Sequence, residues 1–116
     1  MIPTVAEAFA IEWAAAHAAR AAGDWAVAVR HLERAHILGQ RRTRLHVRSH
    51  LGMLALAWRR RDAREVWGQL ARTAAAAVFS RLWVPEGNTG GANVSATQPM
   101  PVSADLRAIL DADRSG

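Results

Sequence analysis

Cysteine is absent from this chain, which excludes disulfides, thiolate nucleophiles and sulfur-rich zinc sites. Lysine and tyrosine are absent too, and the fifteen basic residues are all arginines, which leaves a net charge of +5. Long hydrophobic runs are also missing, because none approaches the ~20 residues that cross a bilayer. Glu7 and Glu12 interrupt the apolar start of the chain, which argues against a secretory signal. We therefore expect a cytoplasmic protein with no membrane segment.

What is present is rich in alanine and typical of helices. With 116 residues and 51% hydrophobic content, the chain suits one domain with one modest core. Alanine favours helix over sheet, so we expect an all-α fold. We expect residues 1–84 to form a repeat-like core of four helices. An irregular segment over residues 85–116 should dock on that core.

Short polar residues mark the expected starts of the helices. Thr4 with Glu7, and Asp62 with Glu65, have the spacing of a capping box, in which side chains satisfy free backbone N–H groups. Glycine follows each of the first two helical stretches, and Pro85 prevents the fourth from continuing. The expected N-caps are Thr4, Asp24, Thr43 and Asp62.

The end of the chain combines an irregular stretch with a short helix. Residues 85–101 are rich in glycine, asparagine, serine, threonine and proline, so they cannot form a regular helix. Ser103 can cap a last helix that carries Leu106, Ile109 and Leu110. These apolar side chains would gain nothing on a free tail, so we expect the segment to fold back onto the helices.

The second helix begins with a pattern that is typical of paired helices. From Gly23 the chain reads GDW-x-x-A-x-x-x-L-x-x-A, which resembles the middle of a tetratricopeptide repeat. This resemblance implies two stacked helical hairpins whose groove binds a protein partner. Asp24 and Asp62 lie further apart than the ~34 residues of the standard repeat, so strict membership is less well supported. Two hairpins are fewer than the ~3 repeats that such folds need, which also raises a homodimer as an alternative.

A second resemblance covers nearly the whole chain. The strings HLERAHILGQ, HVRSH, GQLAR and PEGNTGGANVS look like the signature of a small bacterial family of helical proteins with no assigned function. The resemblance implies that the histidine strings and the glycine-rich string belong to one functional unit. It supplies no activity.

Two pairs of potential metal ligands carry the leading functional prediction. Glu33 and His36 are three residues apart, and His46 and His50 are four apart, so each pair shares one face of its helix. On adjacent antiparallel helices, these four side chains could hold one ion. Imidazole and carboxylate suit a divalent transition metal, namely zinc, iron, nickel or cobalt. Glu33 lies at the edge of its helix face and is the least well placed of the four.

The histidines have a simpler explanation as hydrogen-bonded core residues, with Glu33 paired to an arginine. We expect His17 and His31 to be structural or exposed. No nucleophile triad can be assembled, so catalysis is undecided; an enzyme would use metal-assisted chemistry with Glu33 as the base. The leading prediction is a small metal-binding protein in metal handling. The alternative is a non-catalytic interaction module of the tetratricopeptide type.

The glycine-rich string GNTGG could bind an anion or a cofactor through its backbone N–H groups. The candidate residues are Asn88, Gly90 and Gly91, although the string suits a simple turn equally well. Asn88 and Asn93 could instead reach over the helices and complete the metal site. On the fourth helix, Gln69 belongs to a polar face that either orients the histidines or forms a surface network.

Arginines cluster at both ends of the third helix, and their guanidinium groups are suited to phosphate. No recognition-helix pattern accompanies them, so we expect no nucleic-acid partner. Tryptophans recur at helical positions and should pack between helices: Trp13, Trp25, Trp58 and Trp67.

Overall fold

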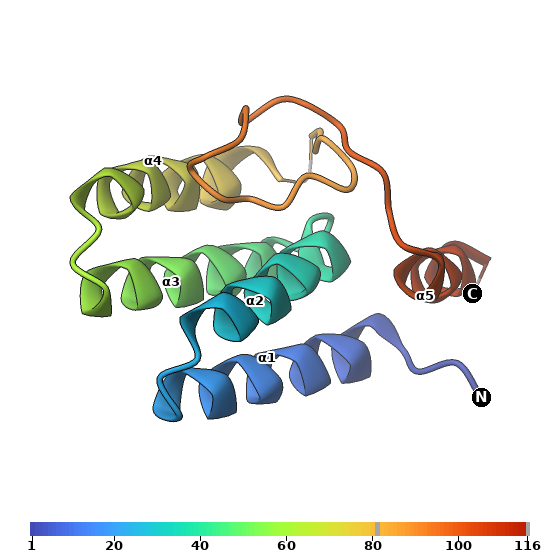
Figure 1. Cartoon of the computed structure of the whole chain (residues 1–116). Coiled ribbons are helices and arrows are strands. Elements are labelled where there is room, and N and C mark those ends of the chain that lie inside the picture. Colours follow the sequence, from blue (N-terminus) through green and yellow to red (C-terminus); the bar gives the residue numbers. More distant parts are fainter. Residues whose placement is uncertain (81, 116) are drawn as a thin grey trace.

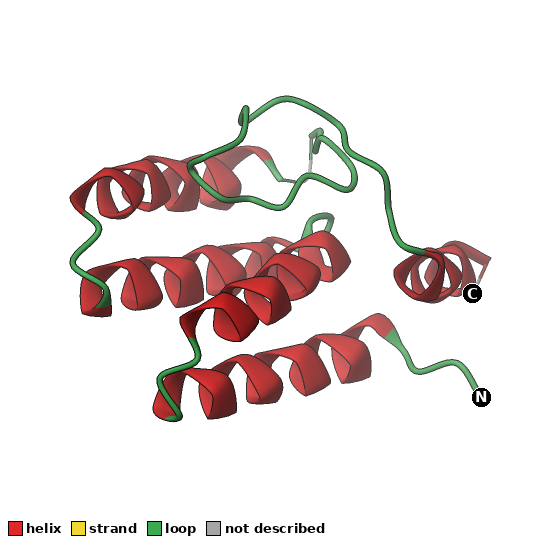
Figure 2. Ribbon diagram, viewed as in Figure 1, coloured by secondary structure: helices red, strands yellow, loops and turns green. Residues whose placement is uncertain are grey.

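A computed structural model describes residues 1–80 and 82–115 and confirms the all-α prediction. The helices are α1 (Val5–Ala21), α2 (Trp25–Gly39), α3 (Thr43–Arg59), α4 (Ala63–Phe79) and α5 (Ala104–Ser115), and these described ranges contain no strand. In Figure 1, α1 to α4 stack in chain order as two hairpins, and α5 lies beside the end of α1 and α2. Figure 2 shows short turns between the stacked helices and one long loop before α5. Within the described part, no helix is long and apolar enough to span a membrane.

The expected N-caps are confirmed at three helices. Thr4, Asp24 and Asp62 each accept a hydrogen bond from a backbone N–H group in the first turn of α1, α2 and α4. The prediction that Thr43 caps α3 is wrong, because Thr43 lies inside the helix and no side chain caps that end. Its hydroxyl instead accepts a hydrogen bond from the Ser80 hydroxyl at 3.0 Å. A contact within the second hairpin, between α3 and the end of α4, therefore uses a group that the local pattern assigned to capping.

Two apolar clusters hold the helices together. One cluster joins α1, α2 and α5, and includes the buried side chains of Leu38 and Leu106. The other joins α1, α2 and α3, with Leu32 and Met53 at its centre and Trp13 packed against it. The C-terminal helix therefore covers one end of the stack, while α4 belongs to neither cluster.

The segment between α4 and α5 is tied to the helices by polar contacts. Glu86 forms ion pairs with Arg107, at 2.6 Å, and with Arg114, both on α5. The main-chain oxygen of Pro85 accepts a hydrogen bond from the Gln40 side chain at 3.1 Å. These contacts hold the start of the segment against α5 and the end of α2, and Figure 1 shows the loop returning past α4 toward α5.

The polarity of α4 is reversed compared with an ordinary surface helix. Its inward side carries the fully buried Gln69 and the half-buried Arg72. Its outward side carries Trp67 and Val78, which are 73% and 67% exposed. The prediction that Trp67 packs between helices is wrong, and so is the same prediction for Trp58, which is 72% exposed.

Candidate metal centre

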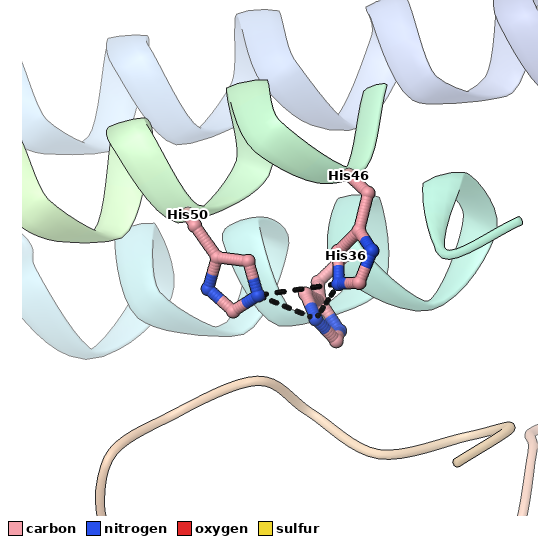
Figure 3. A group of neighbouring side chains, drawn as sticks. All are labelled: His36, His46 and His50. Atoms are coloured by element: carbon pink, nitrogen blue, oxygen red, sulfur yellow. Dashed lines mark hydrogen bonds between the residues drawn. The ribbon is translucent and has the colours of Figure 1, made fainter. Parts of the chain in front are cut away.

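Three imidazoles converge between α2 and α3, as Figure 3 shows. The Nε2 atom of His36 lies 3.1 Å from Nε2 of His46 and 3.1 Å from Nε2 of His50. The remaining distance, between Nε2 of His46 and Nε2 of His50, is 3.2 Å. All three side chains are buried, and they form a group that could hold a metal ion. The structure therefore brings together three of the four predicted ligands.

Helix geometry and a tight connection produce this convergence. His46 and His50 are one turn apart on α3, so both rings project from the same face. His36 lies in the last turn of α2, and the chain reverses directly after it. A Cβ atom added at Gly39 would lie 2.7 Å from Cβ of Leu45, so glycine allows α2 and α3 to approach this closely.

Carbonyl oxygens fix the orientation of two of the rings. Nδ1 of His36 lies 2.8 Å from the main-chain oxygen of Asn88, and Nδ1 of His50 lies 2.7 Å from the side-chain oxygen of Gln69. The amide nitrogen of Gln69 donates to the main-chain oxygen of Gly90 at 2.8 Å, which sets the direction of the amide. Because a carbonyl oxygen only accepts, both Nδ1 atoms carry a proton and both Nε2 atoms present a lone pair.

The third ring has a different environment. Nδ1 of His46 is buried and has no hydrogen-bond partner among the described residues. No hydrogen bond from a described residue outside the cluster orients this ring, so only its helix and the two neighbouring rings hold it in place. A buried polar atom without a partner costs stability. Within the described part of the chain, no contact outside the cluster therefore determines whether Nδ1 or Nε2 of His46 carries the proton.

Burial keeps the cluster uncharged at neutral pH. Desolvation lowers the pKa of His36 well below its usual value, and the neighbouring His50 and His46 lower it further. Burial lowers the pKa of His46 to about 4, and burial also lowers the pKa of His50. Metal ions bind neutral imidazole, so the cluster is in the protonation state that coordination requires.

The glycine-rich string forms one wall of the cluster. Gly90 has φ +82° and packs against His36, and a Cβ atom added there would lie 2.5 Å from the imidazole ring. Arg72 of α4 donates hydrogen bonds to the main-chain oxygens of Gly91 and Val94, at 2.5 and 2.7 Å. The inward polar face of α4 therefore positions the string, and the string positions His36.

A cavity of about 290 Å³ adjoins the three histidines. Gln40, Arg72 and Asn88 add polar groups to its wall. The apolar part of the lining comes from the second half of α4 and the residues after it: Ala75, Ala76, Phe79, Trp83 and Val84. A ligand from solution, rather than a fourth side chain, therefore has room beside the imidazoles.

Glu33, the fourth predicted ligand, is not part of the histidine group. It lines a separate cavity together with Glu65 and Asn93. Burial raises the pKa of the Glu33 carboxyl, and the nearby Glu65 raises it further. Positions three apart on a helix still differ by about 60° in direction, which is enough to place Glu33 and His36 in different cavities.

The other candidate groups have partners outside the histidine cluster. Nδ1 of His17 lies 2.8 Å from a main-chain oxygen of its own helix, and Nδ1 of His31 lies 2.6 Å from the Glu12 carboxylate. At the start of α3, Arg42 forms an ion pair with Asp113 of α5 at 2.5 Å. These contacts give the two histidines and this arginine structural roles.

The groups that hydrogen-bond to the histidines were only partly predictable from the sequence. The sequence left two roles open for Gln69, either orienting a histidine or joining a surface network. Its bond to His50 matches the first role. Asn88 was expected either to offer its backbone N–H group to an anion or to reach over the helices with its side chain, but it is its main-chain oxygen that faces His36. Its amide nitrogen donates to the main-chain oxygens of Ser95 and Gln98 instead. A main-chain contact leaves no signal in the side-chain pattern of a sequence.

Comparison with known proteins gives a family and no activity. A family model described as protein of unknown function (DUF3703) matches residues 3–110. No curated protein and no solved structure matches the chain. The expectation of a family without an assigned function is therefore confirmed.

Proposed function

The chain belongs to the DUF3703 family, whose function is unknown, and we propose that it is a metal-binding protein that serves in metal handling. The Nε2 atoms of His36, His46 and His50 hold one divalent transition-metal ion. A fourth coordination position faces the adjoining cavity.

This proposal rests on one observation. Three Nε2 atoms lie within 3.1–3.2 Å of one another, although the protons of His36 and His50 are on Nδ1. His36 and His50 keep their protons on Nδ1, so their Nε2 lone pairs face each other at 3.1 Å. A proton on Nε2 of His46 can bridge to only one of them at a time, which leaves lone pairs opposed in a buried site. A cation among the three rings satisfies all three nitrogen atoms at once.

The spacing and the donor type restrict the choice of metal. With metal–nitrogen bonds of about 2.0–2.1 Å, tetrahedral ligands stand about 3.3–3.4 Å apart. The observed distances between the Nε2 atoms, 3.1–3.2 Å, are close to this separation of tetrahedral ligands. Imidazole without thiolate suits zinc, nickel, cobalt or iron(II), and the usual order of affinities favours nickel and zinc over iron.

The open fourth coordination position favours a protein that takes up and releases the ion over one in which the ion is purely structural. Structural zinc sites usually have four protein ligands, whereas three protein ligands leave one position for water or another molecule. Among the described residues, the group that could hold a metal contains three side chains. A cavity beside it allows an incoming ligand to take the ion or deliver it.

Metal analysis of protein purified without a histidine tag tests the proposal. After incubation with zinc, nickel, cobalt or iron(II) and dialysis, the wild type should retain about one ion per chain. His36→Gln and His50→Gln should each lower the affinity for the metal by more than ~10–100-fold. That range is typical when a group that hydrogen-bonds to a metal ligand is lost.

His17→Gln is the matched control, because His17 lies outside the cluster and bonds to its own helix. It should retain the ion as the wild type does, and circular dichroism should be the same for all variants. A wild type that retains none of the four metals contradicts the proposal. So does a His17→Gln variant that loses as much affinity as His36→Gln.

A further inference from the structure

The outward face of α4 carries an apolar stripe. The stripe Trp67, Ala71, Ala74 and Val78 lies opposite the buried Gln69, and all four of its residues are exposed. Leu70 and Phe79 flank it, at 43% and 56% exposed. We call these six residues, together with the exposed Leu82 and Trp83, the α4 face.

None of the described helices covers this face. α4 packs on α3, whereas α5 packs on α1 and α2 at the far side of the stack (Figure 1). A surface helix normally turns its apolar stripe inward, but the inward side of α4 is occupied by the polar groups that hold the histidine cluster. A contiguous exposed apolar surface of this kind is typical of an interaction site.

We propose that the α4 face is the interface of a homodimer, in which α4 of one copy packs antiparallel on α4 of a second. One argument for a second copy is that the stripe from Trp67 to Val78 carries no charged side chain, so it can pack against its own copy. The exposed Arg64 lies one turn before Trp67 and would stand at the rim of the contact. A twofold axis near Ala74 makes the contact isologous, so Ala74 meets Ala74 of the other copy and each residue before it meets one that follows it.

The order of residue sizes along the face fits this pairing. Small side chains at Ala71 and Ala74 stand near the axis, where they let the two helices approach within the ~8–10 Å of packed helices. Trp67 lies two turns before Ala74, and Val78 lies about one turn after it. In an antiparallel pair, Trp67 of each copy therefore packs near Val78 and the C-terminal end of α4 of the other.

The available area is sufficient for a stable contact. An aromatic side chain buries roughly 150–250 Å². Trp67, Phe79 and Trp83 are each more than half exposed, so together they offer on the order of 300–400 Å². The aliphatic members add a comparable area, which brings the face near the ~800 Å² per partner of a standard interface.

Analytical ultracentrifugation with a matched pair of variants tests the dimer. The wild type should sediment as a dimer, and Val78→Glu should weaken dimerisation about 30-fold or more, because it places a charge inside the interface. Ile11→Glu on α1 is the control, since Ile11 is 62% exposed on a helix at the opposite side of the stack from α4 (Figure 1). A wild type that is monomeric at all concentrations, or an equal loss for both variants, overturns the proposal.

A second measurement uses the absence of cysteine. Ala74→Cys places a single thiol near the twofold axis, where the two Cα atoms come within the ~4.4–6.8 Å that a disulfide needs. Mild oxidation should crosslink Ala74→Cys into a covalent dimer much faster than Ile11→Cys. Equal rates for the two variants contradict an interface centred on α4. Neither substituted position lines the histidine cavity, so metal binding should stay unchanged and serves as the folding control.

Discussion

At the scale of single residues, the histidine spacing predicted that the imidazoles of His36, His46 and His50 converge, as they do in the structure. Positions four apart on one helix face the same way, so His46 and His50 had to be neighbours once α3 formed. That His36 meets them depended on α2 and α3 being adjacent, which the hairpin pattern indicated. Glu33 could not be placed from spacing alone, because a small angular offset decides which of two cavities a side chain enters.

Gly90→Ala is expected to weaken metal binding about 10–100-fold, as loss of an outer group around a metal ligand typically does. The added Cβ would lie 2.5 Å from the His36 ring, and φ +82° is strained for alanine. Isothermal titration with zinc measures the effect, and helical content should not change.

Gly91→Ala is the neighbouring control. Its Cβ would meet the carboxamide oxygen of Asn93 at 2.5 Å, the mobile end of a side chain that can move aside. Affinity close to that of the wild type is expected. Equal losses for Gly90→Ala and Gly91→Ala would mean that the close packing on His36 is irrelevant to the ion.

At the scale of helices and segments, local signals predicted most starts and failed where tertiary contacts prevailed. Thr4, Asp24 and Asp62 cap as their patterns indicate. Thr43 does not, because its hydroxyl bonds to Ser80, a residue far along the chain. The outward position of Trp67 was not predictable either, since hydrophobicity does not reveal which side of an apolar helix faces the protein.

Docking of α5 should depend on the charge of Glu86. Hydrogen bonds from Arg114 and Arg107 lower the pKa of Glu86 from 4.5 to about 2. Since the pKa is lower in the folded state, this carboxylate stabilises the fold above about pH 4.5 and loses that contribution as the pH falls toward 2. After allowance for solvent screening, the contribution is about 1–2 kcal/mol.

The comparison of the wild type with Glu86→Gln isolates this contribution from other titrating groups. Urea unfolding should find the variant less stable at pH 7, and the difference should shrink steadily between pH 4.5 and pH 3. A difference that is the same at pH 7 and pH 3 would show that the Glu86 charge does not hold α5.

At the scale of the whole molecule, one arrangement explains both the site and the exposed apolar surface. The polar side of α4 faces inward, where Gln69 bonds to His50 and Arg72 holds the glycine-rich string. The apolar side of the same helix consequently faces outward. The sequence predicted stacked hairpins but not this reversal, because both sides of α4 contain residues that favour a helix.

X-ray absorption spectroscopy of zinc-loaded protein, purified without a histidine tag, measures the proposed coordination directly. Convergence of His36, His46 and His50 predicts a shell of three imidazole nitrogens at about 2.0–2.1 Å and one further light atom. A zinc shell with fewer than three imidazoles would contradict coordination by this cluster.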